Sequence, residues 1–179
     1  DINHYCLSDR LCPEAPIPIL SVARTEPKAG GAGLVAANLR SLGCDVLEHY
    51  GSFSEKERYW VGHHLVSRVD RDSYHVEPTG EQAEHLKPRI AETDLIVISD
   101  YCKGAMDWNL ARLLITSGKP TFVDTKGIHP EWYKDCFALF PNRQEYELLR
   151  GQEHLFQHIV LKLGEEGCKL DGVLVPARK

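Results

Sequence analysis

The sequence predicts an α/β protein built on a parallel sheet. Three observations favour this class: short apolar runs, a polar or glycine-rich turn directly after each run, and helical segments between the runs. The order strand, turn, helix, strand is typical of right-handed βαβ units. Four runs carry the pattern, at residues 95–98, 121–123, 137–140 and 159–163.

The remaining segments complete the expected order of elements. We expect residues 1–16 to be irregular, residues 17–22 to form an edge strand that tolerates Pro18, and residues 59–69 to form another strand. All 179 residues are expected to form one domain. Apolar spacing with a period near 3.6 predicts helices at 34–42, 80–92 and 108–116.

Composition limits the class of function. The chain has 42% hydrophobic and 26% charged residues, as ordinary globular proteins do. A formal net charge of −5 and scattered lysines and arginines argue against nucleic acid or an anionic membrane surface as a partner. No apolar run in the sequence reaches the ~20 residues that cross a bilayer, and the six cysteines have no metal-binding spacing. We expect a cytoplasmic protein with free thiols.

A glycine-rich segment precedes the first expected helix. Residues 29–33 are Ala-Gly-Gly-Ala-Gly, and backbone amides at a helix N-terminus favour an anion or ligand hydroxyl groups. A tight turn with close packing explains the same segment equally well. Gly30 and Gly31 are therefore candidates for ligand binding, with the structural alternative left open.

Acidic and basic residues follow two successive strands. Asp100 and Lys103 come after the first strand, and Asp124 and Lys126 after the second. Ligands of open α/β sheets bind at the carboxyl ends of the strands. Carboxylates there accept hydrogen bonds from ligand hydroxyls, and ammonium groups pair with phosphate. A surface turn with a local ion pair explains either pair alone, but two pairs at one edge favour a site.

Asn142 and Glu145 stand three residues apart after the third strand. This is the spacing of a capping box, in which the two residues satisfy each other's backbone amides at a helix start. The functional alternative is a carboxylate linked to Mg²⁺ through water.

Taken in order, these segments resemble the ribokinase-like (PfkB) carbohydrate kinases. The resemblance is closest to the heptose 7-phosphate kinases, the kinase half of bifunctional heptose kinase/nucleotidyltransferase enzymes. The string Pro-Glu-Ala-Pro-Ile-Pro at 13–18 is similar to the opening of that branch. Further segments similar to family motifs follow in the family's order, at 29–39, 56–58 with 68–70, 99–105, 124–127, 141–145 and 163–167.

The resemblance implies a Rossmann-like ribokinase fold with a small β lid, whose strands would lie at about 14–24 and 56–70 of a single partial domain spanning 1–179. It implies transfer of the ATP γ-phosphoryl group, with Mg²⁺, to a sugar or sugar phosphate, for example heptose 7-phosphate to give the 1,7-bisphosphate. Homodimerisation through the lid is a further implication.

The resemblance also assigns residues to ligands. Asp1, Gly30, Gly31 and Arg58 would contact sugar, and Lys103 and Lys126 would lie near substrate phosphate or nucleotide. The carboxylates of Asp100 and Asp124 join this substrate-binding set. The nucleotide would be bound by Asn142, Glu145, Lys162 and Gly164, with Glu145 linked to the metal.

The chain departs from the family pattern at several positions. Leu34 stands where a sugar-contacting Asn is usual, and Lys162 where a Thr is common. Residues 175–179 resemble the segment just before the family's GAGD loop, so the general-base Asp is expected beyond Lys179 and the C-terminal part of the fold beyond this chain. Two hypotheses follow: a sugar kinase seen in part, or a truncated, non-catalytic, kinase-like sugar-binding or scaffold protein.

Overall fold

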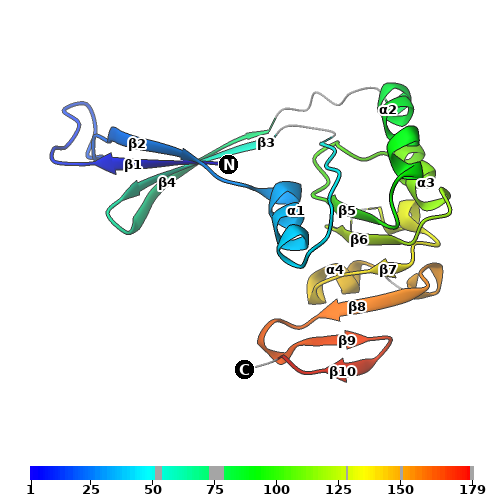
Figure 1. The fold of residues 1–179 in the computed structure, drawn as a ribbon. Helices are drawn as coiled ribbons and strands as arrows, with labels where there is room; N and C mark the ends of the chain where they lie inside the picture. The colour runs from blue at the N-terminus through cyan, green and yellow to red at the C-terminus, as the bar shows by residue number, and fades with distance from the viewer. Residues whose placement is uncertain (51–53, 73–78, 128, 150, 178–179) are drawn as a thin grey trace. The chain divides into compact units, whose positions relative to one another are not determined.

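The computed structural model describes residues 1–50, 54–72, 79–127, 129–149 and 151–177 (Figure 1). The chain divides into two compact units. Unit 1 comprises Asp1–Glu48 and Phe53–Tyr74, and unit 2 comprises His49–Ser52 and His75–Lys179. The last two residues of the 175–179 segment lie outside the described residues.

Unit 1 contains a four-stranded sheet with the order β2-β1-β3-β4. Strand β1 pairs antiparallel with β2 and parallel with β3, and β3 pairs antiparallel with β4. Helix α1 follows β2 in the chain. The elements are β1 (Ile2–Leu7), β2 (Ser21–Pro27), α1 (Gly31–Ser41), β3 (Ser54–Val61) and β4 (His64–Asp72).

Three expectations for this part of the chain are wrong. Residues 1–16 are not irregular throughout, because β1 lies between two strands that give its backbone groups partners on both sides. The strand expected at 17–22 begins only at Ser21, and before it Pro18 forms an isolated antiparallel bridge with Leu11. The strand expected at 59–69 is two strands, which turn at Gly62 with φ 57°. The assignment of this sheet as a lid stays a prediction.

Unit 2 contains a six-stranded sheet with the order β10-β9-β8-β7-β6-β5. Strands β5 to β8 are parallel neighbours, which confirms the predicted parallel sheet, and β9 and β10 add an antiparallel edge. Helix α2 packs on α3, and α4 contacts β8. The elements are α2 (Thr79–Ala91), β5 (Ile96–Asp100), α3 (Trp108–Ile115), β6 (Thr121–Thr125), the 3₁₀ helix η1 (Pro130–Tyr133), β7 (Ala138–Leu139), α4 (Arg143–Leu148), η2 (Glu153–Leu155), β8 (His158–Lys162), η3 (Gly164–Glu166), β9 (Cys168–Leu170) and β10 (Val173–Val175).

The core of unit 2 joins α3 to the parallel strands. Leu110 and Leu114 lie four residues apart on one face of α3, and they are buried with Ile98 of β5 and Val123 of β6. The side chain of Asp107 caps α3 by accepting the Leu110 N–H at 2.8 Å. This packing fixes where β5 and β6 end, and therefore where the polar turns after them begin.

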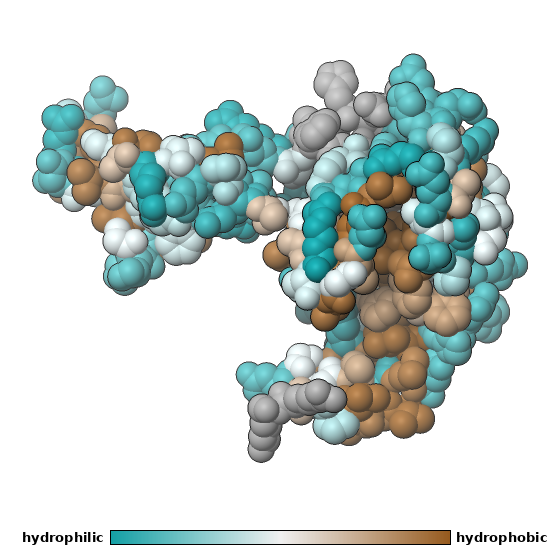
Figure 2. All heavy atoms as spheres, viewed as in Figure 1, coloured by the Kyte–Doolittle hydropathy of each residue, from teal (hydrophilic) through white to brown (hydrophobic). Residues whose placement is uncertain are grey.

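The surface of unit 2 is apolar at one end. In the β9–β10 hairpin, Val173 and Leu174 are exposed, and Figure 2 shows hydrophobic side chains gathered at this end of the unit. Among the helices described, none has the length and apolar character needed to cross a membrane.

Candidate functional site

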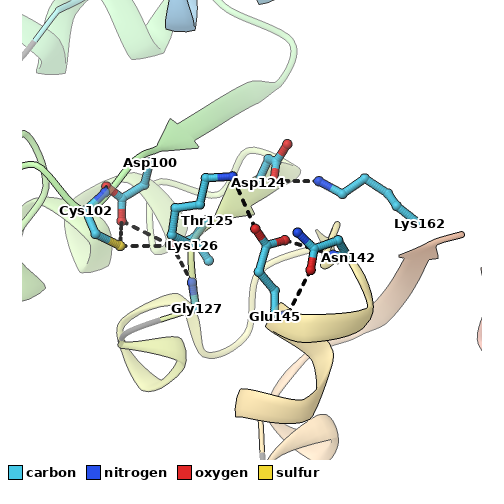
Figure 3. Close-up of polar contacts among 9 residues, drawn as sticks. All are labelled: Asp100, Cys102, Asp124, Thr125, Lys126, Gly127, Asn142, Glu145 and Lys162. Atoms are coloured by element: carbon cyan, nitrogen blue, oxygen red, sulfur yellow. Dashed lines mark hydrogen bonds and ion pairs between the residues drawn. The ribbon is translucent and has the colours of Figure 1, made fainter. Parts of the chain in front are cut away.

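Four charged side chains form two ion pairs at the carboxyl edge of the unit 2 sheet (Figure 3). The ammonium of Lys126, in the turn after β6, donates to Glu145 Oε1 at 3.2 Å. The ammonium of Lys162, the last residue of β8, donates to Asp124 Oδ1 at 2.8 Å. In Figure 3 the side chains of Lys126 and Lys162 both extend toward Asp124. The structure thus brings together residues of two predicted motifs, 124–127 and 141–145, with Lys162, which directly precedes a third motif.

Asn142 and Glu145 form a complete capping box at the start of α4. Asn142 Oδ1 accepts the Glu145 N–H at 2.9 Å, and the Asn142 N–H donates to Glu145 Oε2 at 2.8 Å. The structural alternative raised for this pair is therefore confirmed. A contact of either residue with nucleotide stays a prediction.

The charge of Lys126 is maintained by its neighbours. Burial alone would lower the pKa of Lys126, but the hydrogen bond and negative charge of Glu145, together with the charge of Asp124, raise this pKa above its ordinary value. The ammonium also lies 5.3 Å from the centre of the Tyr101 ring. Lys126 therefore carries a positive charge at neutral pH.

The described residues do not form a dedicated magnesium site. Both carboxylate oxygens of Glu145 are already engaged, one by Lys126 and the other by the amide of Asn142. Within the described ranges, no group of three His, Cys, Asp or Glu side chains is placed to hold a metal ion. Direct coordination by Glu145 does not fit this arrangement.

Asp100 faces protein donors and is almost fully buried. Its Oδ1 accepts the Cys102 N–H at 2.8 Å. Its Oδ2 accepts the hydroxyl protons of Tyr133 at 2.6 Å and of Thr125 at 3.2 Å. This orientation differs from the solvent-facing one that direct contact with a substrate would require.

Three further predicted or motif residues lie in the turns at this edge. Lys103 is half-buried in the turn after β5. Gly127 closes the turn after β6 with φ 76°, and a Cβ there would lie 3.5 Å from the Glu145 carbonyl oxygen. Gly164 begins η3, directly after the residue that follows β8.

The four residues predicted to contact sugar meet in unit 1. Arg58 Nη1, on β3, donates to Asp1 Oδ2 at 2.9 Å. Gly30 is the N-terminal cap of α1, Gly31 is its first residue, and a Cβ on Gly30 would lie only 2.5 Å from Asp1 Oδ1. The glycine therefore makes room for the aspartate beside the helix start. Leu34, which replaces the usual family Asn, is exposed on the first turn of α1.

Sequence reasoning missed the side chains that hold Asp100. Tyr133 lies in η1, 33 positions after Asp100, and no local spacing indicates the bond between them. Thr125 lies inside the 124–127 motif, but the motif indicates no role for its hydroxyl. A buried tyrosine hydroxyl almost always has a partner, and this was the one general signal that applied to Tyr133.

The sequence has relatives among proteins of known name, although no family model matches it. The chain is 30% identical over 181 residues to bifunctional protein HldE of Citrifermentans bemidjiense, a match that covers 80% of the chain and 37% of that protein. It is 32% identical over 173 residues to D-beta-D-heptose 7-phosphate kinase of Bordetella bronchiseptica, covering 76% of the chain and 54% of the kinase. The chain thus spans between about a third and about a half of these relatives.

Solved structures share the fold. Phosphofructokinase-2 from Escherichia coli in complex with fructose-6-phosphate matches 99% of the chain with a TM-score of 0.58 and 13% identity, over 74% of that structure. Ribokinase from Giardia lamblia matches 94% of the chain with a TM-score of 0.51 and 9% identity, over 72% of that structure. The fold is therefore that of the ribokinase-like carbohydrate kinases. Within that class, the sequence is similar to bifunctional protein HldE and to a D-beta-D-heptose 7-phosphate kinase, and the resemblance seen in the motifs is confirmed.

Proposed function

We propose that the chain is part of an ATP-dependent sugar kinase that phosphorylates a sugar phosphate, with heptose 7-phosphate as substrate and the 1,7-bisphosphate as product. One observation carries the proposal. Lys126 and Lys162 lie at the carboxyl edge of the parallel sheet, and the ammonium of each donates a hydrogen bond to a carboxylate. An incoming phosphate can take the place of that carboxylate.

The proposed substrate contacts divide by chemistry. Lys103 and Lys126 pair with phosphate oxygens, and Asp124 accepts hydrogen bonds from hydroxyl groups. In unit 1, the Asp1–Arg58 pair and the backbone at Gly30 and Gly31 contact sugar hydroxyls. Support comes from the geometry within each unit. Lys103, Asp124 and Lys126 lie at strand ends of the unit 2 sheet, and in unit 1 the side chain of Arg58, from within β3, reaches Asp1 beside the start of α1.

The nucleotide is proposed to lie near Asn142, Glu145, Lys162 and Gly164. Phosphoryl transfer depends mostly on positioning and on neutralising charge, which lysines and backbone amides provide. When bound, Mg²⁺ would neutralise phosphate charge further; we propose that it arrives with ATP and reaches Glu145 only through water. The general base belongs to the proposed remainder of the protein, beyond Lys179. We further propose that the protein is a cytoplasmic enzyme and that it dimerises through the unit 1 sheet.

Calorimetric titration with heptose 7-phosphate tests the proposal. The wild-type chain should bind this compound, and Lys126→Ala should weaken the binding about tenfold or more, because a charge-assisted bond to phosphate is lost. Lys119→Ala removes the same charge at the opposite end of β6 and should bind as the wild type does.

Absence of binding by the wild-type chain would refute the substrate site. Equal affinities for Lys126→Ala and Lys119→Ala would refute the role of Lys126. Binding of heptose 7-phosphate without ATP turnover in the full-length protein would instead favour the non-catalytic sugar-binding alternative.

A further inference from the structure

The buried carboxylate of Asp100 connects the two turns that carry the phosphate-side lysines. Asp100 ends β5, is 5% exposed, and accepts hydrogen bonds on both oxygens. A carboxylate removed from water is tolerated only when its oxygens have donors. Here the donors do more than satisfy the carboxylate, because two of them directly precede Lys103 and Lys126 in the chain.

Two of the donors adjoin the lysines in sequence. The Cys102 N–H belongs to the residue before Lys103, and the Thr125 hydroxyl to the residue before Lys126. In addition, the Lys126 N–H donates to the Asp100 carbonyl oxygen at 3.2 Å. The positions of both lysine backbones are therefore tied to one aspartate.

The backbone of the turn before Lys103 needs a hydrogen bond that stabilises its conformation. Cys102 has φ 54°, in the left-handed region that residues other than glycine adopt at a cost. Its amide bond to Asp100 Oδ1, at 2.8 Å, holds the backbone in that conformation. The Cys102 sulfur lies 3.6 Å from Asp100 Oδ2, so its side chain is placed against the same carboxylate.

The third donor comes from outside both turns. Tyr133 is fully buried, with its ring in the hydrophobic core and its hydroxyl 2.6 Å from Asp100 Oδ2. The ring and the hydroxyl therefore have separate roles, since the ring packs and the hydroxyl fixes the carboxylate. The η1 helix thus anchors a carboxylate that in turn holds two turns of the candidate site.

We propose that Tyr133, acting through Asp100, is a positioning residue that sets the backbone of Lys103 and Lys126 for binding of a phosphate group. The attraction between an ammonium and a phosphate depends on their separation, so a small shift of these turns reduces affinity. The inference rests on the proposed function for its ligand, and on the hydrogen bonds alone for the coupling between the turns.

The test uses Tyr133→Phe, which removes the hydroxyl and keeps the ring. Backbone hydrogen exchange should become faster at residues 102–104 and at 125–127. Affinity for heptose 7-phosphate should fall by up to about tenfold, because the free energy of the lost hydrogen bond limits the effect, and affinity for the unphosphorylated heptose should not change. Tyr146→Phe, on the half-buried tyrosine of α4, is the matched control and should alter neither measurement.

A second pair of variants tests the same coupling in case Tyr133→Phe does not fold. Thr125→Val removes another donor to Asp100 and should repeat both effects, whereas Thr125→Ser keeps the hydroxyl and should behave as the wild type. Unchanged exchange at both turns in Tyr133→Phe and Thr125→Val would overturn the coupling. An equal loss of affinity for the phosphorylated and unphosphorylated sugars would overturn the positioning role, because it indicates a general loss of structure. If the wild type binds no sugar phosphate, the proposed function fails, and the exchange rates still decide whether Tyr133 fixes the turns.

Discussion

The ammonium of Lys162 lies 2.8 Å from Asp124 Oδ1, although 38 positions separate the two residues in the chain. The pair connects the ends of β8 and β6, which lie on either side of β7 in the sheet. Both side chains are partly exposed, and ion pairs of this kind contribute little to stability. An anion that reaches Lys162 therefore displaces Asp124 at a small cost in free energy.

Lys162→Ala should weaken the binding of a phosphate chain without destabilising the fold. We expect an affinity loss of about tenfold for inorganic tripolyphosphate, which tests the phosphate contact apart from adenine. The free energy of unfolding should change by less than about 0.5 kcal/mol. Titration calorimetry and urea unfolding measure the two quantities. Lys169→Ala, on exposed β9, is the matched control; if it weakened binding as much, the effect would be one of net charge alone.

Asn142→Ala should destabilise unit 2 by about 1 kcal/mol, the usual effect of losing an N-cap side chain. Helix α4 has only six residues, and a helix this short depends strongly on its cap. Asn109→Ala replaces an exposed asparagine in the first turn of α3 and should change stability by less than about 0.5 kcal/mol. Urea unfolding of the two variants compares the values directly, and indistinguishable midpoints would show that the Asn142 side chain contributes nothing to stability.

Glu57 should make unit 1 sensitive to acid. A hydrogen bond from Tyr59 at 2.6 Å and another from Arg71 at 2.6 Å, with the nearby charge of His4, lower the pKa of Glu57 from an ordinary 4.5 to about 2. A carboxylate with a lowered pKa stabilises the fold above its unfolded-state pKa, and this contribution is lost as the pH falls from 4.5 toward 2.

The thermal midpoint of the wild type should fall over that range of pH, and the thermal midpoint of Glu57→Gln should fall much less. Glu55→Gln, on the exposed side chain two residues earlier in β3, should keep the wild-type profile. Thermal melts monitored by near-ultraviolet circular dichroism at several pH values check both. A wild-type profile in Glu57→Gln would assign the acid sensitivity to other groups.

Gly30→Ala should separate Asp1 from Arg58. The backbone of Gly30 has φ −128°, which alanine adopts without strain, so the conflict is one of space. The new Cβ would lie 2.5 Å from Asp1 Oδ1 and would push the carboxylate out of its 2.9 Å bond with Arg58. Chemical-shift titration with unphosphorylated heptose should then show weaker binding. In Gly80→Ala the added carbon meets no heavy atom within 4 Å, so wild-type binding is expected; equal binding by both variants would remove Asp1 from the site.

The sequence predicts a structural feature well when the residues that produce the feature are close together in the chain. The Asn142–Glu145 box depends on a spacing of three residues, and the parallel strands follow from short apolar runs with polar turns, so both were predicted. The ion pair of Lys126 with Glu145, 19 positions apart, depends on which strands are neighbours, which no run of residues specifies. Strand β1 was missed for the same reason, because its backbone partners in β2 and β3 lie far away in the chain.

The place of β1 between β2 and β3 has a consequence for how unit 1 folds. The β1–β2 and β3–β4 pairs are antiparallel neighbours along the chain, so each can form early through a comparatively short loop. The parallel pairing of Ile2 with Glu57 must close a far longer loop that includes α1. During synthesis, the first strand emerges long before its second partner and exposes an unpaired edge until β3 arrives. We therefore expect the pairing of β1 with β3 to be the slow step in the folding of unit 1.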